Sequence, residues 1–147
     1  MKVFNLVFLI CIYFSSNLYC QDNSLEISIE ITGINNQQGN VGIALFRGED
    51  GFPMGIERAK TTSFVAIQDS ALIYSIKDIS VGEYAICVFH DEDLNREINT
   101  NFIGMPKEGV GVSNNPKPRM GAPRYVDCKF HTDTTNRLMI KMRYIGQ

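Results

Sequence analysis

Apolar and polar side chains alternate along much of this sequence, and a period of two restricts the chain to β-structure. The segment LEISIEIT at residues 25–32 has leucine or isoleucine at every odd position and a polar residue at every even one. Successive side chains of a strand point to opposite faces, so the segment predicts a strand with one buried and one solvated face. Similar segments occur at residues 41–46, 63–67, 71–76, 83–90, 124–131 and 137–145.

These segments predict an all-β domain. Antiparallel strands with one solvated face bury the other face by packing as two facing sheets. We therefore expect an antiparallel β-sandwich of about seven strands. Residues 56–60 have room for one helical turn at most. No repeat or change of composition divides residues 21–147, which we expect to form a single domain.

The first twenty residues have a different character. Lys2 precedes an apolar run of about a dozen residues, which is shorter than the 20 or so that a membrane-spanning helix needs. We predict that residues 1–20 are a signal peptide cleaved after Cys20, and the alternative is a lipoprotein that carries its lipid on Cys20. Export would place the domain in the periplasm, on the cell surface or outside the cell.

Two cysteines, Cys87 and Cys128, follow the predicted signal peptide. An oxidising compartment favours a disulfide between them, and the alternative is two small buried apolar side chains. Two cysteines are too few for a structural zinc site. The net charge of −2, without a basic cluster, gives no indication of a nucleic acid partner.

Residues 96–124 form an unusually long connection that is rich in glycine and proline. Loops of this length are uncommon in compact domains and usually serve a function. We expect it to fold over one end of the sandwich, anchored by the apolar residues Phe102, Ile103, Met105, Val110, Val112 and Met120. The candidate recognition surface comprises Asn101, Phe102, Gly104, Pro106, Lys107, Glu108, Ser113, Asn114 and Arg119.

A longer pattern covers this loop and the strand before it. A strand ends in His90 and Asp91, an Asp/Asn-rich turn follows, and residues 101–115 read N-F-x-G-x-P-x-E-G-x-G-x-S-N-N. This pattern resembles a secreted bacterial family known as domain of unknown function 2141. The resemblance implies an extracytoplasmic β-sandwich of transthyretin-like or immunoglobulin-like type, and it implies no established activity. The segment ISVGEYAICV at residues 79–88 also resembles the beginning of a strand in transthyretin-like modules.

The turn after residues 83–90 has an oxygen-bearing side chain at every second position. These residues are Asp91, Asp93, Asn95, Glu97 and Asn99. Alternating oxygen ligands suit Ca²⁺, which takes about six to eight of them, so a calcium-stabilised structural module is one hypothesis. Arg96 stands where a calcium loop has glycine, and Phe102 stands where it has a bidentate glutamate. The alternative is therefore a turn whose side chains bond its own backbone.

A second candidate site combines His90, Asp91 and His131. If the strands that end in the two histidines pair, these residues could hold a metal ion for hydrolysis. His90 and Asp91 are neighbours in a strand, so their side chains point to opposite faces. Ser113 lacks the Gly-x-Ser-x-Gly pattern of a nucleophile elbow, and we identify no catalytic residue.

The basic residues of the loop have two interpretations. Lys107, Lys117, Arg119 and Arg124 are expected to neutralise the acidic turn. Alternatively they bind an anionic glycan of the cell envelope, with Phe52 or Phe102 stacked on a sugar. The sequence thus predicts a secreted, non-enzymatic β-sandwich with a binding or structural role. Its expected partner is a cell-envelope glycan or another envelope protein, and calcium is the one cofactor considered.

Overall fold

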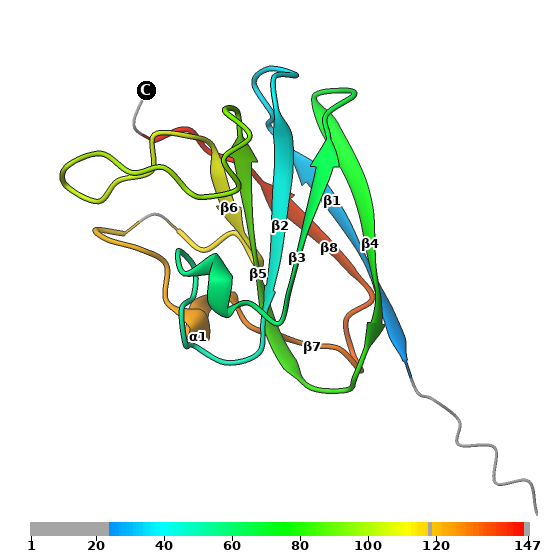
Figure 1. Cartoon of the computed structure of the whole chain (residues 1–147). Helices are drawn as coiled ribbons and strands as arrows, with labels where there is room; N and C mark the ends of the chain where they lie inside the picture. Colours follow the sequence, from blue (N-terminus) through cyan, green and yellow to red (C-terminus); the bar gives the residue numbers. More distant parts are fainter. Residues whose placement is uncertain (1–23, 118, 146–147) are drawn as a thin grey trace, which may run out of the picture.

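The computed structural model describes residues 24–117 and 119–145. The predicted signal peptide, residues 1–20, lies outside the described residues. Eight strands form two facing sheets with almost no helix (Figure 1), which confirms the expected all-β sandwich. In this part of the chain, no helix has the length and apolar character needed to cross a bilayer.

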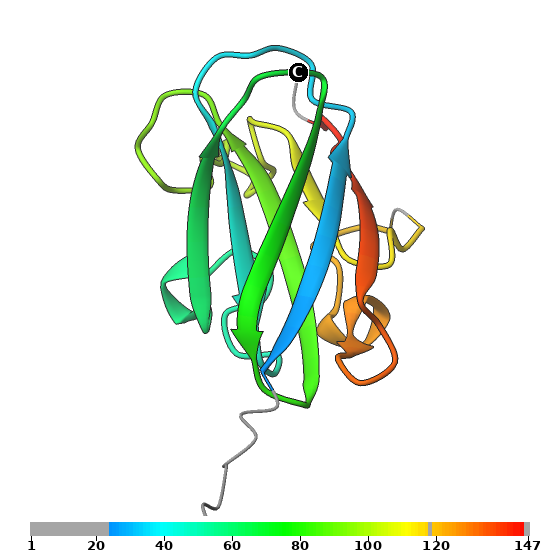
Figure 2. The same ribbon diagram turned by 90° about the vertical axis from the view of Figure 1, so that its right-hand side faces the viewer.

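The smaller sheet has three strands in the order β4-β1-β8 (Figure 2). Their bounds are Leu25–Thr32 for β1, Ala71–Ile79 for β4 and Arg137–Lys141 for β8. β1 pairs antiparallel with β4 but parallel with β8, so the sheet is not wholly antiparallel as expected. A tight turn can join only antiparallel neighbours, whereas β8 reaches β1 after the chain has passed through the second sheet.

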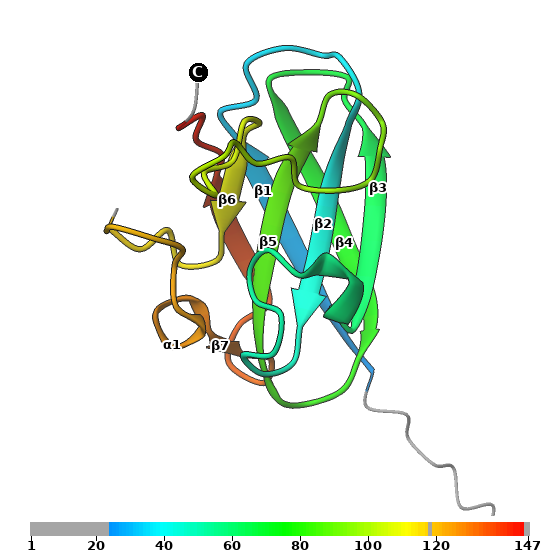
Figure 3. The ribbon, with the colours of Figure 1, turned by 60° about the vertical axis from the view of Figure 1, so that its left-hand side comes forward.

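The larger sheet has the order β3-β2-β5-β6, and β7 pairs with β5 beside that path. The bounds are Asn40–Phe46 for β2, Thr61–Ala66 for β3, Glu83–Asp91 for β5, Val110–Val112 for β6 and Phe130–His131 for β7. Every residue of β5 after the first is buried. One face of β5 faces the core, and loops that lie in front of the sheet cover the other face (Figure 3).

An aliphatic core fills the space between the sheets. Alternate residues of β1 contribute Ile27, Ile29 and Ile31, which are all fully buried, as the period of two predicted. A smaller cluster lies on the outer face of the larger sheet, where Phe46 and Cys87 pack against loop residues. This cluster explains why β2 and β5 are buried on both faces and lack the solvated face that β1 has.

Residues 124–131 were predicted as a strand, and this prediction is wrong for most of the segment. Tyr125–Cys128 makes one helical turn, α1, in which the N–H of Lys129 donates to the carbonyl of Tyr125 at 2.9 Å. An ion pair of 2.9 Å between Arg124 and Asp127 spans this turn. Side-chain pairs three residues apart meet on a helix but not on a strand, so this local pair favours the turn. The expected single turn at residues 56–60 is the 3₁₀ helix η1, Ile56–Arg58.

The long loop is ordered mainly by hydrogen bonds and only in part by the expected apolar anchors, of which Val112 packs against the cluster of Phe46 and Cys87. Phe102, Ile103 and Met120 are 99%, 64% and 104% exposed, so these three predicted anchors are wrong. Within the loop, Val110–Val112 forms β6 against β5. Val110 also exchanges two backbone hydrogen bonds with Arg143, at 2.8 and 2.9 Å, which joins the loop to the chain beyond β8.

The two cysteines are free thiols, and both are buried. Burial raises the pKa of Cys87 to about 12 and that of Cys128 to about 11. Cys128 lies in α1 and not in a strand as expected. The disulfide between them stays a prediction, which thiol counting on the purified protein would check.

Ser113 connects β5 to α1 through a buried hydroxyl, and its replacement tests this connection. Its Oγ accepts from the N–H of Ile86 at 3.0 Å and donates to the carbonyl of Cys128 at 2.6 Å. Ser113→Ala leaves both backbone groups unsatisfied, so we expect a loss of about 1–3 kcal/mol in the free energy of unfolding. Ser75→Ala is the control, because this half-buried hydroxyl makes no hydrogen bond to the described residues. Equal losses in chemical denaturation would contradict the proposed role of Ser113.

A candidate cation site at the end of β5

Three carboxylates converge where β5 ends. They belong to Asp91, Asp93 and Glu108, and one oxygen from each lies within 4.8 Å of the other two. Asp91 is the last residue of β5, Asp93 lies in the turn after it, and Glu108 comes shortly before β6. A β-bridge between Thr100 and Pro106 folds the chain back on itself, and this return brings Glu108 beside the turn.

The Asp91 carboxylate is fully buried and only half satisfied. Its Oδ2 accepts a hydrogen bond of 3.1 Å from the backbone N–H of Arg96. Its Oδ1 is buried and has no hydrogen-bond partner among the described residues. A buried polar atom without a partner is costly, and the cost is greater for a charged group. This oxygen is therefore a candidate ligand for a cation.

Asp93 is held in place by two asparagine side chains. Its Oδ2 accepts from the amide groups of Asn95 and Asn99 at 3.1 and 3.0 Å, and its Oδ1 accepts from the N–H of Asn95 at 3.2 Å. The amide of Asn95 also donates to Oδ1 of Asn99 at 3.1 Å. Each carboxylate oxygen has two lone pairs, so an oxygen with one hydrogen bond can still bind a cation.

Glu108 is buried, with 6% of its surface exposed. Its two oxygens accept from the N–H groups of Glu92 at 3.1 Å and Asn99 at 3.3 Å. Burial raises the pKa of Glu108, and the nearby Asp93 charge also raises it, while the hydrogen bonds to Glu92 and Asn99 oppose this shift. The carboxylate thus sits where negative charge is unfavourable unless a cation is present.

The expected neutralisation of this turn by basic loop residues is wrong. Arg119 and Arg124 contact Asp127 instead, at 4.0 and 2.9 Å. Arg96 directs its guanidinium over the ring of Phe64, 5.4 Å from the centroid. Over residues 24–117 and 119–145, no ion pair involves any of the three carboxylates. The cluster is therefore acidic, and no ion pair with a described residue compensates it.

The donor set is suited to a hard cation. All three groups offer oxygen, and no histidine or cysteine belongs to the cluster. Carboxylate oxygens suit Ca²⁺, Mg²⁺ and Mn²⁺, whereas zinc and copper sites favour nitrogen or sulfur. Oδ2 of Asp93 already accepts two hydrogen bonds, so the three residues could together supply up to five oxygens, and water would complete the shell.

The structure assigns different roles to the residues that the sequence put forward as cation ligands. Asp91 and Asp93 do converge, but Asn95 and Asn99 orient Asp93 through their amides. Glu97 is exposed and lies outside the cluster. Glu108 was assigned to the loop surface and not to the cation site, because only the Thr100–Pro106 bridge brings it back to the turn.

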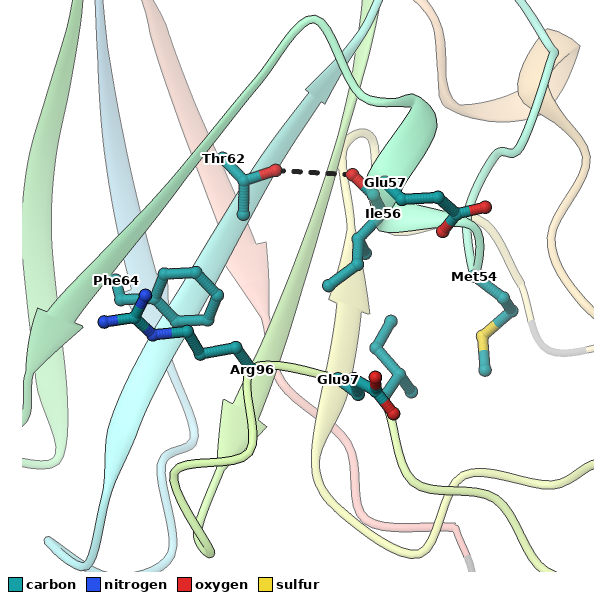
Figure 4. Close-up of a pocket in the computed structure, with 8 residues that line it drawn as sticks. Met54, Ile56, Glu57, Thr62, Phe64, Arg96 and Glu97 are labelled. Carbon is teal, nitrogen blue, oxygen red and sulfur yellow. Dashed lines mark hydrogen bonds between the residues drawn. The ribbon is translucent and has the colours of Figure 1, made fainter.

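Arg96 and Glu97 of the turn help to line a shallow hollow beside it (Figure 4). Its volume is about 570 Å³. Strand β3 contributes Thr62 and Phe64, and the segment around η1 contributes Met54, Ile56 and Glu57. Arg96 covers the face of Phe64, so a sugar could not stack on that ring without displacing the guanidinium.

The metal-hydrolase candidate at His90, Asp91 and His131 is wrong. Nδ1 of His90 is 2.8 Å from the Tyr144 hydroxyl, and Nε2 is 2.6 Å from the carbonyl of Gln38. His131 is opposite Glu83 at the far end of β5 and contacts Asp133. Seven residues of strand separate these positions, which is roughly 23 Å at the usual rise.

The remaining loop residues have mainly structural contacts. Asn101 Oδ1 accepts from the N–H groups of Ile103 and Met105 at 3.1 and 3.0 Å. The amide of Asn114 donates to the carbonyl of Lys129 at 2.8 Å. Gly104, Lys107 and Arg119 are exposed, and Pro106 is half-buried in the bridge to Thr100. Phe102 is the largest exposed apolar side chain among the candidate surface residues.

The raised pKa of Glu108 predicts a specific dependence of stability on pH. A carboxyl with a raised pKa binds its proton more tightly in the folded state, so its favourable contribution is complete below the ordinary pKa of 4.5. That contribution is lost as the pH rises through the folded pKa. In chelator, the wild type should therefore lose stability relative to Glu108→Gln as the pH rises above the ordinary pKa of 4.5. Denaturation at several pH values measures this difference, and a constant difference would contradict the assignment.

Comparison with known proteins gives a family without a described function. No curated protein and no solved structure matches the chain. A family model described as an uncharacterized protein conserved in bacteria (DUF2141) matches residues 29–139, which run from the second half of β1 through the acidic cluster to the first three residues of β8. The match covers most of the chain and confirms the resemblance seen in the loop motif. The chain therefore belongs to the DUF2141 family of proteins conserved in bacteria.

Proposed function

We propose that this protein is an exported, non-enzymatic β-sandwich module whose Asp91–Asp93–Glu108 cluster binds Ca²⁺. The observation that carries the proposal is the buried Oδ1 of Asp91, which lacks a hydrogen-bond partner among the described residues and belongs to a group of three carboxylates. A divalent cation would satisfy this oxygen and offset the repulsion within the cluster at the same time.

The repulsion is large enough to matter. Two unit charges separated by 4.8 Å, the upper limit within the cluster, repel by roughly 3 kcal/mol at an effective dielectric constant of about 20. No arginine or lysine forms an ion pair with these groups in the described part of the chain. Protonation of Glu108 lowers the repulsion at acidic pH, and a bound cation is the remaining way to lower it at neutral pH.

Calcium fits this site better than magnesium or zinc. The cluster has oxygen ligands only, which disfavours zinc. Five of the six carboxylate oxygens already accept hydrogen bonds in directions set by the turn, and such a site resembles the irregular geometry that Ca²⁺ tolerates. Mg²⁺ demands near-octahedral geometry and gives up its water reluctantly.

The bound cation would have a mechanical role. It would join the end of β5, the turn and the returning loop, because one ligand comes from each of these segments. Calcium sites of extracellular modules have dissociation constants of about 10⁻⁴–10⁻³ M, so a site of this kind suits an exported protein. The apolar run after Lys2 supports export. A surface that binds an envelope glycan or an envelope protein is part of the same proposal.

Thermal unfolding with calcium and with chelator tests the proposal. Binding to the native state stabilises it by about 2.7 kcal/mol when free calcium is about 100 times the dissociation constant. Asp91→Asn keeps an oxygen for the Arg96 N–H and removes one negative charge, so this variant should fold in chelator and lose the response to calcium. The matched control is Glu97→Gln in the same turn, which should keep the response because Glu97 lies outside the cluster. An unchanged midpoint for the wild type would refute calcium binding.

A further inference from the structure

The tip of the hairpin at residues 99–108 exposes two adjacent apolar side chains. Phe102 is 99% exposed and Ile103 is 64% exposed. Figure 1 shows this hairpin reaching sideways beyond both sheets, so that its tip is convex and separate from the body of the domain. A large exposed aromatic side chain on a protruding tip is typical of a surface that enters another phase or partner.

Most backbone N–H groups of this tip donate hydrogen bonds within the turn. The N–H of Asn101 donates to the carbonyl of Met105 at 2.8 Å, and the N–H of Gly104 donates to the carbonyl of Asn101 at 3.0 Å. The N–H groups of Ile103 and Met105 both donate to the side chain of Asn101. Entry into an apolar medium is costly for free N–H groups, and the turn has paired most of its own. This feature favours a lipid interface as the occupant.

The charges at the base of the hairpin connect the tip to the cation site. Glu108 and Asn99 lie at its two ends and are joined by a hydrogen bond of 3.3 Å. Three uncompensated carboxylates at this base would repel an anionic headgroup, and a bound divalent cation would remove most of that repulsion. Lys107 is exposed beside them and forms no ion pair with the described residues, so it is available for an anionic lipid.

We propose that Phe102 and Ile103 insert into the interface of an anionic phospholipid bilayer when the Asp91–Asp93–Glu108 cluster holds calcium. This inference rests on the proposed calcium site. A bilayer needs no shaped pocket to receive a convex tip, whereas a protein partner would need a complementary groove. The tip supplies apolar area, and bound calcium together with Lys107 offsets the three carboxylates, so that the base of the hairpin no longer repels the headgroups.

The chain has no tryptophan, so Phe102→Trp places a single fluorophore at the tip. The full chain with this substitution is mixed with vesicles of phosphatidylglycerol and phosphatidylcholine, and with vesicles of phosphatidylcholine alone. With calcium and anionic vesicles, we expect the emission maximum to move to shorter wavelength and to return when chelator is added. Ile103→Ser in the same background should weaken binding to the anionic vesicles by about tenfold or more, since it removes an apolar side chain that the bilayer would bury.

The control fluorophore is Val81→Trp, in the turn between β4 and β5 at the other end of the sandwich, where the side chain is 48% exposed. Both variants carry the same N-terminal segment, so any binding of that segment to vesicles is common to them. The emission maximum of Val81→Trp should show no calcium-dependent shift. Melting of Phe102→Trp without vesicles reports calcium binding separately. A calcium-dependent melting shift without an emission shift would overturn the membrane inference and leave the calcium site intact. No melting shift would overturn the calcium site, and an emission shift that ignores calcium would overturn the coupling.

Discussion

The buried Oδ1 of Asp91, which has no hydrogen-bond partner among the described residues, is the constraint on which the proposed function depends. β5 runs through the middle of the larger sheet with both faces covered, so the chain carries a carboxylate into the interior at the point where the strand ends. The residues around it do not neutralise that charge. They supply two more carboxylates and a set of N–H groups that hold all three in place. The arrangement concentrates negative charge, and in the proposed function a bound cation offsets it.

The same feature explains the long loop. A compact β-sandwich has no need of a hairpin that reaches beyond its sheets, yet residues 99–108 are tied by a bridge at Thr100 and Pro106 and by Glu108 at the base. The loop is ordered without apolar anchors at Phe102 and Ile103, which leaves these side chains free for contact with a partner. The cation site and the exposed tip can therefore act as one unit, in which the site sets the position of the tip.

Much of the sandwich follows from local pattern. The alternation in β1 is visible in the sequence because a strand with one buried face displays its burial at every second residue, and the continuous apolar run of β5 is visible because both of its faces are covered. Patterns of this kind fail where a nearby contact competes, as at α1, where the Arg124–Asp127 pair favours a turn and leaves Val126 exposed. Such patterns also do not indicate which strands become neighbours, so the parallel pairing of β1 with β8 could not be predicted from them. Two of the three candidate ligands, Asp91 and Asp93, could be predicted because they are close in sequence. Glu108 could not, because only the fold of the loop brings it beside them.

The most direct test of this account is a crystal structure of the protein grown with calcium. The account predicts one ion bound to Oδ1 of Asp91, at the Ca–O distance of about 2.3–2.6 Å, with Asp93 and Glu108 as further ligands. An ordered site in which Oδ1 of Asp91 is instead hydrogen-bonded to protein or water, with no ion at saturating calcium, would contradict it.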